Sequence, residues 1–261
     1  MHDTAPTRAA DYVARCRLRR EKLARFPQAW GITGIENAYA VQMLANEILA
    51  EHLGPPRGLK IGGTTKVMRE MINVPEPLLG EVFDSTVHEN GVVLSLGEFQ
   101  RAGIESEIAA ELAKPLEPDN APSSREEAAD FVAALMPAIE IVDDRYVDFK
   151  TVGAEVQIVD NVFNAASVLG PPVKEWRHLA LDRLGCRTVI DGVEVATGTS
   201  DALMDHPLDA LLFALQRWAG LGRGLPAGSF ISLGTITPVQ WHHGVCQVEI
   251  EGLGGVALTL A

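Results

Sequence analysis

Two glutamates stand one residue apart in an otherwise apolar segment, GIESEIAAEL at 103–112. In a helix Glu105 and Glu107 would lie roughly 200° apart around the axis, whereas in a strand they point to the same side. The strand interpretation leaves Ile104 and Ile108 on the opposite face, where they can pack together. Two close carboxylates repel each other and are costly to desolvate. The pair is therefore either solvated or bound to a cation.

A third carboxylate with the same character is Glu140, in the segment MPAIEIVDD at 136–144, where isoleucine stands on both sides of it. Divalent cations such as Mg²⁺, Mn²⁺ and Ca²⁺ prefer oxygen ligands, so three such glutamates predict a metal site. The alternative is an exposed sheet face on which the first two glutamates pair with cross-strand lysines or arginines. Asp143 and Asp144 follow at the strand end and are expected to be solvated.

The composition excludes several classes of function. The 261 residues are 47% hydrophobic, enough for a large core, and carry a net charge of −13. This charge argues against nucleic acid and anionic membranes, because binding to a polyanion depends on lysine and arginine. The opening MHDTAPTRAADYV lacks a basic region followed by an apolar core, and no uncharged apolar stretch approaches the roughly 18 residues of a spanning helix. We expect a cytoplasmic protein.

The cysteines give no sign of a metal site or a disulfide framework. Cys16, Cys186 and Cys246 are odd in number and far apart, and they lack a CxxC or histidine-interleaved spacing. We expect free thiols.

The first 57 residues are expected to form a small helical lobe. Helical patterns cover 7–25 and 35–52, and GPPRG at 54–58 breaks the second one. The first helix carries a basic outer face that we expect to be solvated, made of Arg15, Arg17, Arg19, Arg20 and Lys22.

Residues 58–261 are expected to form a mostly-β catalytic domain, so the fold class is α+β. Short β-branched runs alternate with glycine and proline, which indicates a curled or barrel-like sheet. The runs are LKIGG, GVVLSL, GIESEIA, PAIEIVD, AEVQIVD, TVIDGVEVATG, SFISLGTI, VCQVEIEG and GVALTL. Two helices interrupt them: one from the capping pair Ser124 and Glu127 to Pro137, and one over HPLDALLFALQRWAGLG at 206–222.

Six blocks resemble the fumarylacetoacetate hydrolase superfamily, in the branch of 2-hydroxypenta-2,4-dienoate hydratases and 4-oxalocrotonate decarboxylases. They are GLKIGGTTKVM (58–68), IESEIA (104–109), PAIEIVDDRY (137–146), DNVFNAASVLG (160–170), DHPLDALLFA (205–214) and PAGSFISLGTIT (226–237). The resemblance covers essentially the whole chain and implies that family's curled core.

The resemblance also implies roles for individual residues. It makes Glu105, Glu107 and Glu140 the metal ligands, and Lys60 an active-site lysine. In an apolar, glycine-flanked run, Lys60 is poorly explained as a surface lysine; it could pair with a substrate carboxylate or donate a proton with a lowered pKa. Thr235 falls beside the substrate, although a threonine at a strand end is usually structural.

The implied chemistry is that of a lyase of aromatic catabolism. Family substrates are 2-hydroxydienoates or 2-oxo-enoates, whose carboxylate and C2 oxygen can chelate one Mg²⁺ or Mn²⁺ ion. The metal ion stabilises the negative charge that develops on the C2 oxygen, and the conjugated double bond thereby becomes electrophilic. Water added at C4 gives a 4-hydroxy-2-oxo acid, while a substrate with a further carboxylate can lose CO₂. The family also implies a homo-oligomer, which can associate with a pathway enzyme.

One block departs from the hydratase pattern. Where hydratases usually carry an aspartate two residues before a glycine, this chain has Leu78 in PEPLLGEVFD. An apolar side chain beside the substrate makes the site drier, which favours decarboxylation. A decarboxylase, however, needs a cation for its second substrate carboxylate, and Lys66, Arg69, Lys114 and Arg145 all read as surface charges. We therefore expect a hydratase, with a decarboxylase as the alternative, and a C–C bond hydrolase or a non-catalytic assembly subunit as lesser alternatives.

Overall fold

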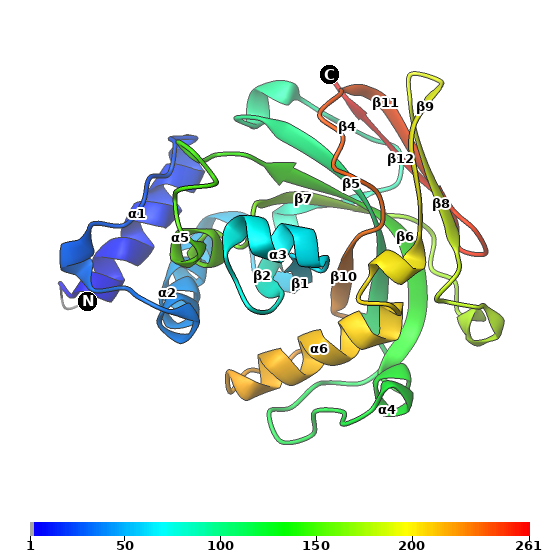
Figure 1. The fold of residues 1–261 in the computed structure, drawn as a ribbon, viewed down its shortest axis with the longest axis horizontal. Helices are drawn as coiled ribbons and strands as arrows, with labels where there is room; N and C mark the ends of the chain where they lie inside the picture. Colours follow the sequence, from blue (N-terminus) through cyan, green and yellow to red (C-terminus); the bar gives the residue numbers. More distant parts are fainter. Residues whose placement is uncertain (1–2) are drawn as a thin grey trace.

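Two helices that pack against each other form the N-terminal part of the molecule (Figure 1). The computed structural model describes residues 3–261. Helix α1 (Ala5–Arg19) begins where the Thr4 side chain accepts a hydrogen bond from the Thr7 backbone, and it ends at Arg20 in the left-handed conformation. Helix α2 (Ile35–Leu53) packs against α1 and α5 (Ala154–Val159). The helix predicted at 35–52 is confirmed, whereas the one predicted at 7–25 is confirmed only to Arg19, because the chain leaves the helix at Arg20.

A curled seven-stranded sheet forms the centre of the fold (Figure 1). Its order is β2 (Leu78–Phe83), β1 (Pro56–Gly62), β10 (Phe230–Thr235), β5 (Ala102–Leu112), β6 (Val132–Asp143), β7 (Asn164–Leu169) and β3 (Val87–Glu89). The long antiparallel pair β5 and β6 has the most extensive contact of any two elements, and Glu105 lies directly opposite Glu140 in it.

A second, five-stranded sheet covers the outer face of the first. Its order is β4 (Val92–Leu94), β12 (Gly254–Leu260), β11 (Gly244–Ile250), β8 (Gly185–Ile190) and β9 (Val193–Thr199). Ile104 and Ile108 are fully buried in the core on this side. Ser106, between them, shares a 2.6 Å hydrogen bond with Thr188 of β8. The predicted division of β5 into an apolar face and an acidic face is confirmed.

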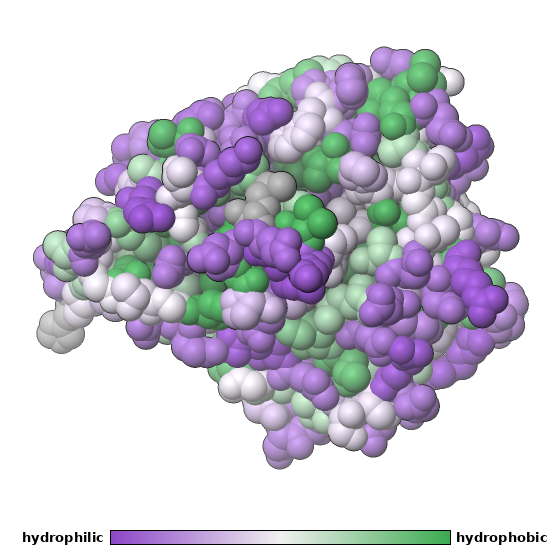
Figure 2. Space-filling view, viewed as in Figure 1, coloured by the Kyte–Doolittle hydropathy of each residue, from purple (hydrophilic) through white to green (hydrophobic). Residues whose placement is uncertain are grey.

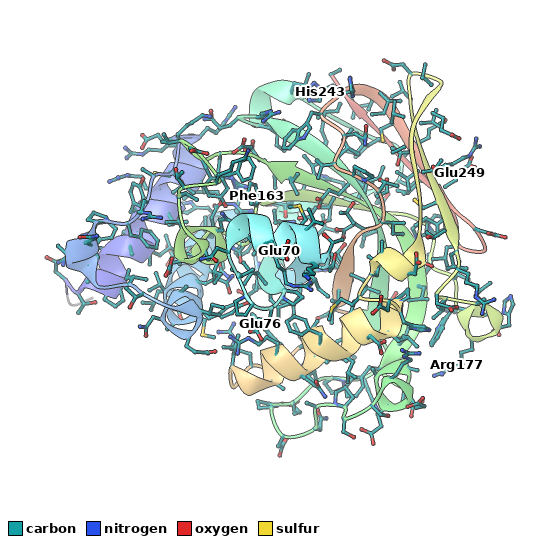
Figure 3. All side chains as sticks on the ribbon, in the orientation of Figure 1. Glu70, Glu76, Phe163, Arg177, His243 and Glu249 are labelled. Carbon is teal, nitrogen blue, oxygen red and sulfur yellow. The ribbon has the colours of Figure 1, made fainter. Side chains whose placement is uncertain are left out.

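The remaining helices are short except for one. They are α3 (Lys66–Ile72), α4 (Arg125–Ala129) and α6 (Pro207–Gly220), with single 3₁₀ turns η1 (Gln28–Trp30), η2 (Asp84–Thr86), η3 (Leu96–Glu98), η4 (Trp176–His178) and η5 (Ser200–Ala202). The segment after α3 is joined to α6 by an ion pair between Glu76, labelled in Figure 3, and Arg217, with Oε1 and Nε 3.3 Å apart.

Two predicted elements are wrong. Ser124 does cap a helix, because its side chain accepts from the Glu127 backbone, but α4 stops at Ala129 and 132–143 forms strand β6. Although this segment has helical periodicity, it forms a strand because it pairs with β5 along its whole length. The predicted strand AEVQIVD is instead helix α5, whose buried apolar residues pack against α2.

Several charged residues expected at the surface are buried. Asp143 and Arg145 are 7% and 4% exposed, and Asp144 is partly buried against Arg101. Oδ1 of Asp143 accepts backbone hydrogen bonds from Gln100 and Arg101, which explains why this strand end is enclosed. The basic face of α1 is exposed as expected at four positions, but Arg17 is half-buried.

The surface and the cysteines agree with the composition. Figure 2 shows a largely hydrophilic face with small, separate hydrophobic areas. No helix within 3–261 is long and apolar enough to cross a membrane. Cys16, Cys186 and Cys246 are all buried free thiols, as predicted. Burial raises the pKa of Cys186 and of Cys246 to about 12.

Candidate metal centre and active site

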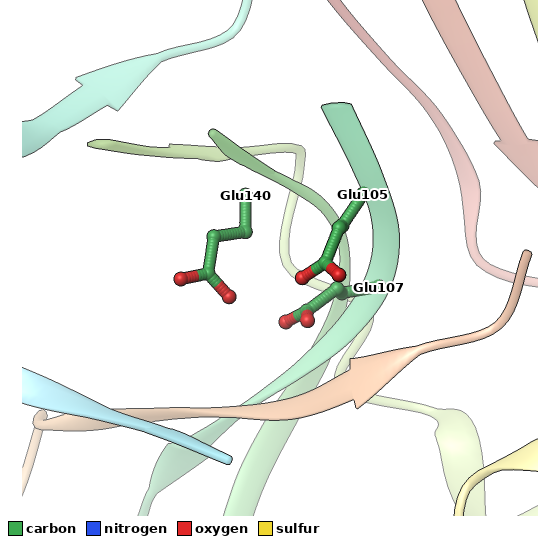
Figure 4. Close-up of side chains that lie close together, drawn as sticks. All are labelled: Glu105, Glu107 and Glu140. Carbon is green, nitrogen blue, oxygen red and sulfur yellow. The ribbon is translucent and has the colours of Figure 1, made fainter. Parts of the chain in front are cut away.

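Glu105, Glu107 and Glu140 converge on the inner face of the curled sheet (Figure 4). Each contributes one carboxylate oxygen to a group whose members lie within 4.8 Å of one another. The strand period places the first two on one side of β5, and the antiparallel register sets Glu140 of β6 directly across from Glu105. The three glutamates selected from the sequence are therefore neighbours.

These carboxylates are enclosed. Glu107 and Glu140 are fully buried, while Glu105 keeps part of its residue surface exposed. Burial, opposed by Lys60 and reinforced by Glu140, raises the pKa of Glu105 to about 7. Burial and the two neighbouring glutamates raise the pKa of Glu107 well above its usual range. Such a cluster is unfavourable without positive charge.

Lys60 supplies one positive charge to this cluster. Its Nζ lies 3.3 Å from Oε1 of Glu140 and donates a 2.8 Å hydrogen bond to the Val162 carbonyl. Burial lowers the pKa of Lys60, but the three glutamates outweigh burial, so that the net shift is upward. Among the carboxylates alone, this direction is opposite to the lowered pKa expected from the sequence, and it favours the ammonium form of Lys60.

Three carboxylates against one ammonium leave room for a divalent cation. Oε1 of Glu107 and Oε2 of Glu140 are buried, and within 3–261 neither has a hydrogen-bond partner. Carboxylate oxygens are the donors that Mg²⁺ and Mn²⁺ prefer. The donor set, its charge and these two oxygens fit a hard divalent cation.

Two residues that the sequence did not single out position the carboxylates. The Ser232 hydroxyl of β10 donates a short hydrogen bond to Oε2 of Glu107, and the Asn164 amide of β7 donates to Oε1 of Glu140 at 3.0 Å. Both are polar residues buried in apolar strands, the same signal that identified Glu140. Serine and asparagine are common in strands for other reasons, so this signal was weaker for them.

A strained turn holds Lys60 in place. Asn161, Val162 and Phe163 all have positive φ, between 52° and 67°. Left-handed backbone is unusual for a β-branched or aromatic residue and persists only when its surroundings enforce it. Two glycines make room: a Cβ on Gly62 would lie 2.4 Å from Val162, and one on Gly80 would lie 2.6 Å from the Asn161 carbonyl oxygen.

The side chain of Asn161 locks this turn. Its Oδ1 accepts from the Glu81 backbone at 2.8 Å, and its Nδ2 donates to Asn46 of α2 at 2.6 Å. Arg145 donates to the carbonyls of Phe163 and Asn164 from the other side. The turn that bears on Lys60 is thus fixed by contacts from β2, α2 and the segment after β6.

Leu78 lies on the same side of the sheet as Lys60. It pairs with Gly62, and Gly80 pairs with Lys60, so the alternation of β1 and β2 puts both side chains on one face. A Cβ on Gly62 would be 3.5 Å from Nζ of Lys60. Leu78 is fully buried.

The other sequence candidates are placed less directly. Thr235 pairs with Glu107, but its hydroxyl donates to the Thr237 carbonyl at 2.7 Å. Its predicted contact with substrate stays a prediction. Arg69 of α3 is held by the carbonyls of Gly63 and Thr64, at 3.0 and 2.8 Å, just beyond the end of β1.

Two more buried oxygens beside Glu140 lack partners within 3–261. They are Oδ1 of Asn164 and Oγ of Ser167. Ser167 pairs directly with Glu140 across β6 and β7, so its side chain shares the face of the carboxylates. Buried polar atoms of this kind are normally satisfied by ordered water or ligand.

The fold is that of fumarylacetoacetate hydrolase-type proteins. 4-oxalocrotonate decarboxylase from Pseudomonas putida G7, complexed with magnesium and adipate, has a TM-score of 0.89 at 23% identity, over 98% of this chain and 97% of its own. Fumarylpyruvate hydrolase from Pseudomonas aeruginosa, in complex with Mn²⁺ and pyruvate, has a TM-score of 0.60 at 13% identity, over 78% and 89%. No family model matches the chain.

Sequence relatives place the chain within one branch. A 4-oxalocrotonate decarboxylase from Pseudomonas sp is 32% identical over 77% of each chain. A 2-keto-4-pentenoate hydratase from Paraburkholderia xenovorans (strain LB400) is 29% identical over 85% of this chain and 82% of its own. The chain therefore belongs to the branch of the fumarylacetoacetate hydrolase superfamily that contains the 2-keto-4-pentenoate hydratases and the 4-oxalocrotonate decarboxylases.

Proposed function

We propose that this protein is a divalent-metal-dependent hydro-lyase that adds water to a 2-hydroxy-2,4-dienoate and gives a 4-hydroxy-2-oxo acid. The observation that carries the proposal is the buried group of Glu105, Glu107 and Glu140 beside the Lys60 ammonium. Relatives that are named hydratases and decarboxylases support the same class of chemistry.

The three glutamates would hold Mg²⁺ or Mn²⁺. A divalent cation bound there supplies Lewis-acid stabilisation of negative charge on a substrate oxygen. Ser232 and Asn164 fix the orientation of two of the carboxylates, because each donates a hydrogen bond to one of them.

Lys60 would place a second positive charge beside the substrate. The Val162 carbonyl and Glu140 orient its Nζ, and the surrounding carboxylates keep it protonated. A buried ammonium in this position can bind a substrate carboxylate, or hold the proton that a carbon atom of the substrate needs when the dienol becomes a ketone.

Hydration requires a place for water within the site. Oδ1 of Asn164 and Oγ of Ser167 are buried on the Glu140 side, and no hydrogen-bond partner for either lies within 3–261. Both atoms can accept a hydrogen bond, and the serine hydroxyl can also donate one. We propose that they bind the attacking water or the hydroxyl group that it becomes.

Decarboxylation is the second candidate, and Leu78 is the observation that favours it. Its buried side chain shares the sheet face of Lys60, at the position where the family pattern places the aspartate of hydratases. Apolar surroundings favour loss of CO₂ by desolvating a carboxylate. Arg69, held at the end of β1, is the best-placed cation for the second carboxylate of such a substrate.

One experiment separates the two reactions. The purified protein with Mg²⁺ would be given 2-hydroxypenta-2,4-dienoate and, separately, 4-oxalocrotonate, while UV absorbance and CO₂ release are followed. Consumption of the first substrate with formation of a 4-hydroxy-2-oxo acid supports the hydratase. Release of CO₂ from the second with no turnover of the first would overturn hydration in favour of decarboxylation.

Leu78→Asp sharpens this comparison. If the leucine suppresses hydration, the variant should gain hydration relative to decarboxylation, while Leu79→Asn, which changes the opposite face of β2, should leave the ratio unchanged.

We further propose a cytoplasmic homo-oligomer of aromatic catabolism, which can associate with a pathway enzyme. The chain would consist of a helical lobe at 1–57 and a catalytic domain at 58–261. The acidic charge and the membership of this branch support the proposal.

A further inference from the structure

A second pocket lies apart from the glutamates, between the end of α1, the turn η2 and strands β3 and β7. It is a cavity of about 290 Å³. Its walls include Arg17, Arg20, Leu53, His88, Phe99 and Arg145. None of the three glutamates lines it, and neither does Lys60. This volume is close to the lower end of the range, roughly 300–1,000 Å³, of small-molecule sites.

Arg17 brings an unpaired charge to this cavity. Its Nη1 is closed off from solvent and has no hydrogen-bond partner within 3–261, and the guanidinium forms no ion pair with any residue of that range. The ring of Phe83 lies 5.6 Å from Cζ of Arg17. Burial, and then the neighbouring Arg145, lower the pKa of Arg17 to about 10. Asp160 and Asp143 oppose this shift, but neither forms an ion pair with the guanidinium. A buried guanidinium with no carboxylate in contact is costly.

The other charges in the wall already have partners. Arg145 lies 3.8 Å from Asp143 and 3.5 Å from Asp160, and it donates to two backbone carbonyls. Arg20 donates to the Gly97 carbonyl. Oδ1 of Asp143 accepts two backbone hydrogen bonds. Arg17 is therefore the group that a ligand would neutralise.

The lining also sets the charge and shape of the ligand. Three arginines and two carboxylates, Asp143 and Glu98, line the cavity, and Asp160 contacts Arg145 from outside the lining, so the local charges balance and disfavour a ligand with two negative charges. Burial lowers the pKa of His88, so the imidazole adds no charge at neutral pH. Leu53, Phe99 and Ala166 supply apolar surface. A monoanion with a short apolar tail matches this lining better than a phosphate dianion does.

We propose that this cavity is a binding site for a small monocarboxylate, with the carboxylate on Arg17 and the apolar tail against Leu53 and Phe99. A guanidinium binds a carboxylate through two parallel N–H···O bonds, which satisfies the enclosed Nη1 and its charge together. The proposal does not depend on the reaction at the glutamates.

The test is calorimetric titration of the metal-free full-length protein with hexanoate in the presence of EDTA. Without metal, the glutamate cluster repels a carboxylate, so saturable binding reports the Arg17 cavity. We expect one site per chain, weakened at least tenfold by Arg17→Gln and unchanged by Arg19→Gln, a matched exposed position on the same helix. 1-Hexanol, which lacks the charge, should not saturate the site, and acetate, which lacks the tail, should bind more weakly.

A second variant covers the case in which Arg17→Gln fails to fold. Ser85 is exposed and lines the cavity, so Ser85→Trp should block entry and abolish hexanoate binding without disturbing the core. No saturable hexanoate binding in the wild type, or equal binding in wild type, Arg17→Gln and Ser85→Trp, would overturn the proposal. Binding of inorganic phosphate at Arg17 in place of hexanoate would overturn the assignment to a carboxylate.

Discussion

Two groups of buried charges lie in this molecule, and they differ in balance. The first sets three glutamates against the single ammonium of Lys60. The second is balanced, because two arginines face two aspartates: Arg145 lies between Asp143 and Asp160, and Arg17 is close enough to lower the pKa of Asp160. The Tyr146 hydroxyl donates to Asp160 at 2.8 Å. Breaking a balanced buried ion pair leaves one charge uncompensated and costs stability. In an unbalanced cluster, by contrast, removing a surplus charge relieves repulsion. Because the surplus charge is unfavourable for folding, its presence indicates a ligand of opposite charge.

The largest expected effect comes from Glu107→Gln. Loss of a ligand should cost several kcal/mol of transition-state stabilisation, which is roughly a thousand-fold or more in kcat/KM with Mg²⁺. The metal-free variant should nevertheless melt at a higher temperature than the metal-free wild type, because one surplus carboxylate has been removed. Steady-state kinetics measure the loss of kcat/KM, and thermal melts with EDTA measure the change in melting temperature. Glu111→Gln, farther along the same face of β5, is the matched control; full activity in Glu107→Gln would refute the assignment.

Asp160→Asn should destabilise the protein, whereas Glu107→Gln should stabilise its metal-free form. The substitution leaves Arg17 and Arg145 to share Asp143, so one buried positive charge is uncompensated, at a cost of about 3–5 kcal/mol in the free energy of unfolding. Urea denaturation measures it. Glu249→Gln breaks an exposed ion pair with Arg187 and should change stability by less than about 1 kcal/mol. If Asp160→Asn were as stable as that control, the contrast between the two groups would be lost.

A smaller effect is expected from Ser232→Ala. The variant keeps all three carboxylates but frees Glu107 from its hydrogen bond, so affinity for Mg²⁺ or Mn²⁺ should fall roughly 10–100-fold. Titration of the metal-free protein with Mn²⁺ measures this. Ser229→Ala, also buried but outside the cluster, should bind the metal like the wild type. Equal affinities in both variants would show that Ser232 does not orient the ligand.

The smallest expected effect is on the pH dependence of stability without metal. The pKa of Glu105 is about 7 in the folded protein, above its ordinary value of 4.5, so the folded state holds a proton that the unfolded state releases. Stability from this group is present below about pH 4.5 and is lost as the pH rises towards 7. Melting temperatures with EDTA should therefore fall between pH 5.5 and pH 8, and Mg²⁺ should stabilise more at pH 8. A metal-free melting temperature that does not change between pH 5.5 and pH 8 would contradict the raised pKa of Glu105.

The sequence identified the three glutamates of the candidate metal centre because a charged residue in an apolar strand is rare without a reason. Glu105, Glu107 and Glu140 stood out against isoleucine neighbours, and strand alternation predicted their common face. Ser232 and Asn164 escaped notice because their buried polar groups have many ordinary uses. Those two contacts depend on register between β10, β5 and β7, which the sequence alone does not specify.

Other errors have a common cause in tertiary structure. The helix predicted towards Pro137 has the right local periodicity, yet strand β5 takes its residues as partners. Arg17 belongs to an exposed basic run by spacing, but η2 and β7 come close to α1 and enclose its guanidinium. Arg145 likewise reads as a surface charge until the turn at 161–163 folds over it. In each case a segment distant in sequence decides the outcome.

The left-handed turn at 161–163 has a consequence for the order of folding. Valine and phenylalanine avoid this backbone conformation in a free chain, at a cost of about 1–3 kcal/mol each. The turn can form only after α2 brings Asn46 into place and β1 and β2 present glycines to it. Lys60 therefore receives its carbonyl partner late in folding, and a partly folded chain can hold most of its core without a competent site. Amide hydrogen exchange at 161–163 should report readiness for catalysis more faithfully than overall helix content does.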